Sequence, residues 1–234
     1  MFFKGINFAI GAATLGVALM TAAPSYAVLI QGTSKGQFSN ITSCGGGDCA
    51  ITGPNDSVLE WGSTSSRHDL QNPSTLTANN VTINVNTNAN DVVIGKLTWY
   101  NSATLDSQTP DSFGFDYKLT VTFTSPLNAV TSQTFDLTII NTTNPTGDKM
   151  TLVDLNSLVF NLPGVTVSDL HYDTDSHSSI SNGKWYNKEY KTATLYILAD
   201  FKADPTPAPE PATLSLMGAG LAGLAARKRR KSKQ

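Results

Sequence analysis

The feature that most constrains the fold is an alternating segment at residues 113–124. Apolar side chains occupy every second position, namely Phe113, Phe115, Tyr117, Leu119, Val121 and Phe123. The positions between them carry polar side chains such as Asp116 and Lys118. Because successive side chains of a strand point to opposite faces, this period predicts a strand with one buried and one polar face. Such strands are typical of antiparallel sheets that are packed on one side.

Further segments with similar patterns predict an all-β body. We expect strands at residues 37–42, 57–61, 81–86, 92–100, 135–139, 158–161, 165–169 and 192–201. Asn, Asp, Gly and Pro residues separate them, and the body shows no convincing 3.6-residue helical period. Many short strands joined by turns predict an antiparallel β-sandwich or jelly-roll-like fold.

The composition of residues 28–208 supports this fold and excludes one class of partner. Glu is almost absent there, while Thr, Ser, Asn and Asp are frequent, which disfavours long surface helices. The same residues include nine basic and 17 acidic side chains, a net charge of −8. Nonspecific nucleic-acid binding depends on Lys and Arg contacts with phosphates, so we expect no nucleic-acid partner.

The first 27 residues have the three parts of a secretory signal peptide. Lys4 supplies a positive charge, residues 8–20 are apolar, and Ser25 and Ala27 are small residues suited to a cleavage site. This apolar run is shorter than the roughly 17–25 residues of a membrane-spanning helix. We therefore expect a signal helix that directs export and is removed after Ala27, rather than a permanent anchor.

The C-terminus combines a Pro-rich linker, an apolar segment and a basic cluster. Residues 204–212 are too rich in proline for a helix interior and are expected to form an extended spacer. Residues 213–226 are apolar or small and predict a helix that the spacer isolates from the body. A basic cluster that retains this helix at the membrane follows, formed by Arg227, Lys228, Arg229, Arg230 and Lys231.

Pro209, Glu210 and Pro211, followed by the apolar helix and the basic cluster, resemble the PEP-CTERM protein-sorting signal. The resemblance implies that exosortase, a membrane enzyme of bacteria, recognises this motif and cleaves nearby. The apolar run of 14 residues is short for a permanent span, so we expect transient retention in the inner membrane before cleavage. The resemblance then implies delivery to the cell surface or the exopolysaccharide matrix. A formal G-x-G-x-x-G at residues 218–223 lacks the preceding strand of a dinucleotide site, so we interpret it as part of the membrane helix.

These features divide the chain into four parts. We expect a signal peptide at residues 1–27, a β-sandwich surface domain at 28–203, a Pro-rich linker with the sorting motif at 204–212, and a sorting helix with a basic tail at 213–234.

The body is similar to a choice-of-anchor K domain, a surface module of the THxN type. The resemblance rests on Trp61-Gly62, on residues 94–101, on the strand that begins at Phe113 and on residues 194–201. This chain has Trp99 where the Thr-His-x-Asn motif of the group has histidine. The resemblance implies a surface location and no particular activity.

Two cysteines, Cys44 and Cys49, enclose a glycine-rich loop and are the only cysteines of the chain. In an exported protein this arrangement favours a disulfide, because glycines let so short a ring close. The alternatives are a redox pair, which would normally be C-x-x-C, and a metal site, which would need further ligands.

Asp169, His171, Asp173, Asp175 and His177 alternate along the chain. On a continuous strand they would share one face and could bind a metal ion, since carboxylates suit Ca²⁺ and imidazoles suit Zn²⁺. The alternative is a solvated acidic loop between strands, in which case the domain needs no cofactor.

A cell-surface glycan or exopolysaccharide is a further candidate ligand. Exposed aromatic rings could stack on sugars, and Trp185-Tyr186 is the better surface candidate because we expect Trp61 and Trp99 in the core. Amides that could bind glycan hydroxyls alternate at Asn84, Asn86, Asn88 and Asn90.

The sequence contains neither a G-x-S-x-G nucleophile elbow nor an H-E-x-x-H zinc motif. His68, His171 and His177 have no recognisable nucleophile partner. We therefore expect a non-enzymatic structural or interaction protein of the bacterial surface or matrix. The main alternative is a carbohydrate-binding module, with or without a calcium requirement, and a polysaccharide-active enzyme is a more distant one.

Overall fold

The computed structural model describes residues 28–44, 49–62, 72–102, 112–141, 147–160 and 162–203. All of them belong to one compact unit, Ala27–Thr206. The predicted signal helix, the Pro-rich linker, the apolar sorting helix and the basic cluster lie outside the described residues. None of the helical structure described here is long and apolar enough to cross a membrane.

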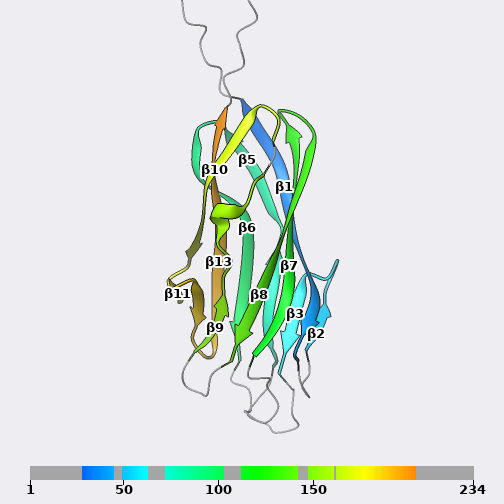
Figure 1. The fold of residues 1–234 in the computed structure, drawn as a ribbon, viewed down its shortest axis with the longest axis vertical. Helices are drawn as coiled ribbons and strands as arrows, with labels where there is room; N and C mark the ends of the chain where they lie inside the picture. The colour runs from blue at the N-terminus through cyan, green and yellow to red at the C-terminus, as the bar shows by residue number, and fades with distance from the viewer. Residues whose placement is uncertain are drawn as a thin grey trace, which may run out of the picture. The chain divides into compact units, whose positions relative to one another are not determined.

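The described residues form two antiparallel sheets (Figure 1), which confirms the all-β prediction. The seven-stranded sheet has the order β11-β12-β9-β8-β7-β1-β5. Its strands are β1 (Leu29–Thr42), β5 (Val81–Asn86), β7 (Ser112–Ser125), β8 (Ala129–Ile140), β9 (Asp148–Thr151), β11 (Ser178–Ser181) and β12 (Lys184–Asn187).

The second sheet has six strands in the order β10-β13-β6-β4-β3-β2. Its strands are β2 (Ala50–Thr52), β3 (Val58–Trp61), β4 (Ser74–Asn79), β6 (Ala89–Asn101), β10 (Val165–Thr174) and β13 (Lys191–Ala203). A short 3₁₀ helix, Leu155–Ser157, is the one helical element of the described residues.

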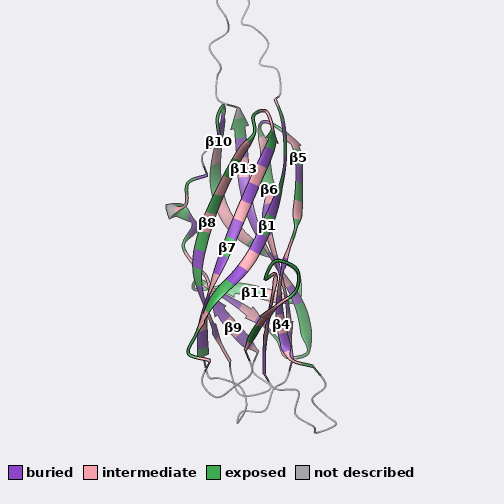
Figure 2. Cartoon of the chain, turned by 90° about the vertical axis from the view of Figure 1, so that its right-hand side faces the viewer, coloured by how far each residue is buried: buried purple, intermediate pink, exposed green. Residues whose placement is uncertain are grey.

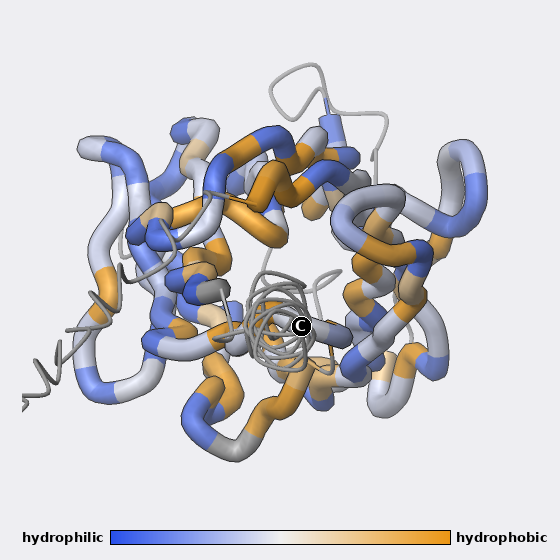
Figure 3. The backbone as a smooth tube through the Cα atoms, turned by 90° about the horizontal axis from the view of Figure 1, so that it is seen from above, coloured by the Kyte–Doolittle hydropathy of each residue, from blue (hydrophilic) through white to orange (hydrophobic). Residues whose placement is uncertain are grey.

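The alternating segment of the sequence is β7, and its apolar side chains are buried as predicted. Phe115, Tyr117, Leu119, Val121 and Phe123 are each at most 2% exposed. Figure 2 shows buried positions recurring along β7, and Figure 3, seen from above, shows hydrophobic and hydrophilic positions alternating along the strands. Burial of one such side chain contributes about 1.5–3 kcal/mol to folding.

The apolar faces of the two sheets meet in a common core. The ring of Trp61 on β3 packs on Phe113 of β7, with centroids 5.5 Å apart. At the other end of β7, Phe123 packs edge-on against Phe201 of β13, with centroids 6.1 Å apart. Contacts between rings therefore join the sheets near both ends of β7.

Strand β1 begins eight residues before the predicted strand at 37–42. Its inward positions in the added part include Gly32, Ser34 and Gly36, which carry no large apolar side chain and give no alternating signal. A Cβ atom at Gly36 would lie 2.5 Å from Cε2 of Tyr117 and 2.7 Å from Cβ of Ala78. The ring of a neighbouring strand thus occupies the space that a β1 side chain would fill.

The predicted strand at residues 158–161 is wrong. Residues 158–160 form no strand, and the unpredicted strand β9 and the 3₁₀ helix precede them. Leu155, Phe160 and Leu162 are nevertheless buried. Apolar side chains of an irregular segment that covers the core therefore produced the strand-like pattern.

The two ends of the body lie side by side. The backbone N–H of Thr87 donates to the carbonyl of Val28 at 2.9 Å, and the N–H of Asn88 donates to the carbonyl of Phe201 at 2.7 Å. The turn between β5 and β6 therefore holds both the first and the last strand. In Figure 1 the start of β1 and the end of β13 both lie at the top.

Candidate functional site

The alternating Asp and His residues do not converge on a metal site. No three His, Cys, Asp or Glu side chains of the described residues form a group that could hold a metal ion. The pairing of β10 with β13 shifts register between Ser168 and His171, and Asp169 has a φ of +50°. The strand then ends at Thr174. The single shared face expected for Asp169, His171, Asp173, Asp175 and His177 is therefore absent, because a bulge and a turn interrupt the period.

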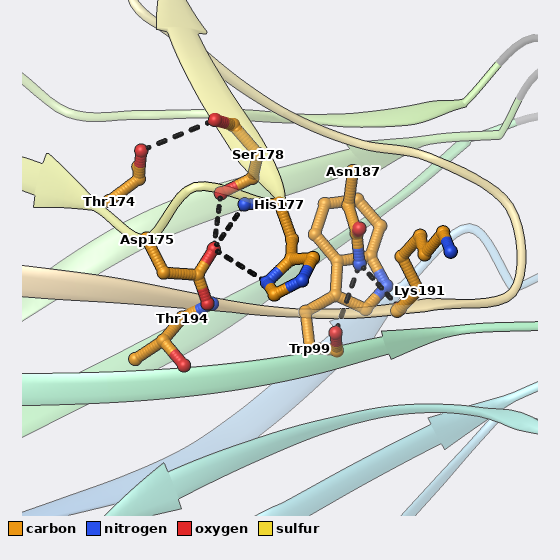
Figure 4. Close-up of polar contacts among 8 residues, drawn as sticks. All are labelled: Trp99, Thr174, Asp175, His177, Ser178, Asn187, Lys191 and Thr194. Atoms are coloured by element: carbon orange, nitrogen blue, oxygen red, sulfur yellow. Dashed lines mark hydrogen bonds and ion pairs between the residues drawn. The ribbon is translucent and has the colours of Figure 1, made fainter.

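Asp175 instead organises the turn that follows β10 (Figure 4). Its Oδ1 accepts hydrogen bonds from the backbone N–H of His177 at 3.0 Å and from the hydroxyl of Ser178 at 3.4 Å. Its Oδ2 accepts from the backbone N–H of Thr194 at 2.7 Å. This carboxylate thus fixes the β10–β11 turn against β13.

His171 and Asp173 also make local contacts. Nδ1 of His171 lies 2.7 Å from the carbonyl oxygen of Asp169, and Nε2 lies 3.4 Å from Oδ1 of Asp91. The Asp173 carboxylate accepts from the N–H of Thr174 at 2.8 Å. These contacts stabilise the bulged strand and give its polar side chains a structural role.

A surface cavity of about 410 Å³ lies beside His171. Its lining includes the apolar side chains of Leu152, Leu155, Leu170 and Ile180. Polar groups are supplied by Asp154, Asn156, His171 and Tyr172. Burial raises the pKa of the Tyr172 hydroxyl, and the nearby Asp154 carboxylate raises it further, so the hydroxyl stays protonated. An aromatic ring beside hydroxyl, carboxylate and amide groups is a combination that can bind a sugar.

The structure joins Cys44 and Cys49 in a disulfide, with Cα atoms 6.2 Å apart. Cys44 follows β1 of one sheet and Cys49 precedes β2 of the other. The disulfide therefore closes the connection between the two sheets.

The interpretation of Trp185 as a surface residue is wrong. Its side chain is 0% exposed, and its ring packs against Trp99 with centroids 5.3 Å apart. Trp99 in turn packs on Trp61 at 6.0 Å, and both are buried as the sequence predicted. Trp185 is buried because it lies on the inward face of β12, which is part of the seven-stranded sheet and faces β6 of the other sheet.

The alternating asparagines are exposed but do not form one continuous row. Asn84 and Asn86 lie on β5, Asn88 lies in the turn with a φ of +68°, and Asn90 lies on β6. Gln31 donates a hydrogen bond to Oδ1 of Asn84 at 3.3 Å. The turn at Asn88 divides the pattern between two strands.

A buried polar cluster at the end of β6 was not identified from the sequence. Asn187, on β12, donates through Nδ2 to the carbonyls of Trp99 at 2.9 Å and Lys191 at 3.2 Å (Figure 4). Asn101 donates through Nδ2 to the carbonyl of Asn187 at 3.1 Å. Both asparagines are 0% exposed. One signal could have revealed the cluster, since the tripeptide Trp-Tyr-Asn occurs at both 99–101 and 185–187.

Two carboxylates adjoin these asparagines. Asp148 is 2% exposed and pairs with Asn187 across β9 and β12. Burial and the nearby Asp148 carboxylate raise the pKa of Glu189 to about 7, while a hydrogen bond from the Asn101 side chain lowers it. The cluster therefore brings two acidic groups and two amides together where the two sheets meet.

Comparison with known families concerns the C-terminal end. Residues 207–230 match the family model of the PEP-CTERM protein-sorting motif. The match includes Pro209, Glu210, Pro211 and the basic residues from Arg227 to Arg230. No curated protein matches the chain. PEP-CTERM signals are recognised by exosortase, a membrane enzyme, so the motif indicates a protein that is exported and sorted to the cell surface or extracellular space.

Proposed function

We propose that this protein is a non-enzymatic component of the bacterial cell surface or exopolysaccharide matrix, released from transient inner-membrane retention by exosortase. The observation that carries the proposal is the PEP-CTERM match at residues 207–230, directly after a β body. The side-by-side ends of that body support it, because Val28 and Phe201 are held by the same turn. Both predicted processing sites thus follow, along the chain, from segments that lie at the same end of the body.

The linker gives the processing enzyme access to the motif. An extended Pro-rich segment rises about 3.1 Å per residue. If residues 204–208 are extended as the sequence predicts, Pro209 would lie up to about 19 Å from Ala203, the end of β13. This distance lets a membrane enzyme reach the motif without unfolding the β body.

The test is to replace Pro209, Glu210 and Pro211 with alanine in the full chain and to follow processing in cells. We expect uncleaved protein in the membrane fraction. A matched control replaces Pro205 and Thr206, which share the linker but lie before the matched residues 207–230, and should be processed as wild type. Release and shortening of the triple variant at the wild-type rate would disprove the sorting mechanism.

We further propose that the body is a surface domain of the choice-of-anchor K type. The residues that carry this resemblance belong to β3, β6, β7 and β13. Three of these four strands belong to the six-stranded sheet, and β7 packs on that sheet through Phe113. Asn101, the asparagine of the Thr-Trp-Tyr-Asn segment, donates a hydrogen bond to the carbonyl of Asn187 in the buried polar cluster. This asparagine therefore supports the fold, even though Trp99 stands where the motif has histidine.

Carbohydrate binding is the second candidate function, favoured by the cavity beside His171. Its lining combines the ring of Tyr172 with the polar groups of Asp154 and Asn156. A glycan array, run with and without EDTA, tests this function. Asn156→Ala should lose any bound glycan, whereas Asn84→Ala, an exposed amide on β5, should not. Turnover of the host exopolysaccharide by the protein would instead indicate an enzyme.

A further inference from the structure

The cavity beside His171 combines an aliphatic wall with a small group of polar side chains. Five of its ten lining residues are aliphatic, namely Leu152, Val153, Leu155, Leu170 and Ile180. We propose that this cavity binds an N-acetylamino sugar, with the methyl group of the acetyl substituent against the aliphatic wall. This inference rests on the carbohydrate-binding function proposed above and specifies the class of sugar.

The cavity lies where the outer strands of the two sheets adjoin. Strand β10 is the last strand of the six-stranded sheet, and β11 is the last strand of the seven-stranded sheet. The segment after β9 forms a third wall, and the backbone N–H of Leu152 donates to the carbonyl of Gly183 at 2.8 Å. This hydrogen bond fixes the segment to the turn between β11 and β12. The cavity is therefore formed by the fold itself, as is usual for a ligand site.

A bulge in β10 contributes to the cavity. Leu170, His171 and Tyr172 all line it, although successive side chains of a regular strand point to opposite faces. The pairing of β10 with β13 shifts register between Ser168 and His171, next to these residues. Bulges are frequent beside binding sites because they redirect a side chain. The irregularity that separates the alternating Asp and His residues thus brings an apolar and two polar residues to one wall.

The aliphatic wall favours a ligand with a methyl group. The hydroxyl groups of an unmodified sugar would lose water at this wall without gaining a hydrogen-bond partner, which is unfavourable. A methyl group would instead remove apolar surface from water. Ile180 is 37% exposed, so the protein leaves part of this wall open to solvent. A bound methyl group would cover it.

The polar side chains match the amide of an acetamido group. Asn156 donates through Nδ2 to Oδ1 of Asp154 at 2.7 Å, which determines which side of the Asn156 amide is the oxygen. That oxygen can accept the N–H of the sugar substituent. The Tyr172 hydroxyl is hydrogen-bonded to the backbone of Val153 and can donate to the acetyl carbonyl. One substituent thus offers a donor, an acceptor and a methyl group to a cavity that has a partner for each.

The charge of Asp154 disfavours other sugars. No lysine or arginine is among the described residues that line the cavity, so a uronic acid would meet a carboxylate without a compensating cation. An amino sugar without the acetyl group would be attracted to Asp154, but its ammonium group would lose water against the aliphatic wall. Acetylation removes that charge and adds the methyl group.

Three oligosaccharides with the same linkage test the proposal, because they differ in one substituent. Tetramers of glucose, glucosamine and N-acetylglucosamine carry a hydroxyl, an amino or an acetamido group at the same carbon. Calorimetry with the full chain should show at least about tenfold tighter binding of the acetylated tetramer than of the glucose tetramer, the usual effect of filling an apolar subsite.

Variants decide whether the acetyl group occupies this cavity. Ile180→Ala removes apolar surface from the wall, so it should weaken binding of the acetylated tetramer about tenfold and leave the affinity for the glucose tetramer unchanged. Val130→Ala is the matched control, because Val130 is an exposed apolar residue of β8 outside the cavity, and it should bind as wild type. Tyr172→Phe keeps the ring and removes the hydroxyl, so it should also reduce the preference for the acetylated tetramer.

Four results would overturn the proposal. Equal affinities for the glucose and acetylated tetramers would show a sugar site that does not recognise the acetyl group, and tighter binding of the glucosamine tetramer would show selection by charge. Wild-type affinity of both Ile180→Ala and Asn156→Ala for the acetylated tetramer would place the sugar elsewhere. Binding to no glycan of the array would reject the carbohydrate-binding function as a whole. None of these results bears on exosortase sorting, which depends on a different part of the chain.

Discussion

The ring of Trp185 packs edge-on against that of Trp99, with centroids 5.3 Å apart and planes at 72°. Trp99 belongs to β6 of the six-stranded sheet and Trp185 to β12 of the seven-stranded sheet. Each is followed by tyrosine and then by a buried asparagine, and the two asparagines are joined by a hydrogen bond. Two copies of one tripeptide, on different sheets, thus form both the aromatic and the polar contact between the sheets at this end.

Trp185→Ala should therefore destabilise the body by about 3–5 kcal/mol, the usual cost of removing a buried indole. Denaturant unfolding followed by far-UV circular dichroism measures this change. Tyr186→Ala is the matched control, because Tyr186 is the next residue but is only half-buried. An equal loss in both variants would mean that the edge strand, rather than the ring contact, determines the effect.

Whether a strand of the fold could be predicted from the sequence depended on the size of its inward side chains. β7 was predictable because large apolar side chains occupy its inward positions. The first half of β1 was not, since Gly32, Ser34 and Gly36 face the core and leave room for groups of β7. The hydropathy of a small residue describes that residue alone and does not reveal that a side chain of a neighbouring strand fills the space beside it.

The same limit applies to the buried polar cluster. Asn101 and Asn187 are 86 positions apart, and no local spacing relates them to Asp148 or Glu189. The alternating Asp and His residues, in contrast, are close in sequence, yet a bulge and a turn separate their side chains. Residues that are close in sequence therefore did not form a common site, whereas residues that are distant in sequence meet at one end of the two sheets.

Gly36→Ala should destabilise the body by about 1–3 kcal/mol, the typical cost of forcing an extra group into a packed site. The added Cβ would lie 2.5 Å from the ring of Tyr117. In a Tyr117→Leu background the ring is absent, so the cost of Gly36→Ala should fall. A double-mutant cycle of unfolding free energies measures this coupling, and strictly additive effects would contradict the close contact.

Asp116 and Asp136 lie opposite each other on the solvent face of β7 and β8. The hydrogen bond between their carboxyl groups raises the pKa of Asp136 above its usual value of 3.8, and their mutual repulsion raises it further. Because the pKa is higher in the folded state, the wild type should lose stability as the pH rises from 3.8 through the raised value. Asp136→Asn should not show this loss, so its thermal midpoint should exceed that of wild type at neutral pH. Parallel pH profiles for the two proteins would contradict the coupling.

Reduction of the Cys44–Cys49 disulfide should cost about 2 kcal/mol, because so short a loop loses little entropy on closure. Unfolding of the protein with and without a reductant measures the difference, and the Cys44→Ser and Cys49→Ser double variant provides a check without reductant. Loss of the whole fold on reduction would show that the β1–β2 connection depends on the disulfide.

The last prediction separates the structural role of Asp175 from a metal-binding one. Asp175→Ala removes an acceptor that serves the backbone N–H groups of His177 and Thr194 together with the Ser178 hydroxyl. Hydrogen bonds to a charged group contribute about 1.5–3 kcal/mol, so we expect a loss of this size, measured by denaturant unfolding in EDTA. His177→Ala keeps the backbone donor and removes an exposed ring whose Nδ1 lies 4.0 Å from Oδ1 of Asp175. Because exposed pairs of this kind contribute little, it should leave stability within about 0.5 kcal/mol of wild type. If a metal ion held this segment instead, His177→Ala would destabilise the body as much as Asp175→Ala in the presence of that metal. In EDTA, His177→Ala and wild type would then be equally stable.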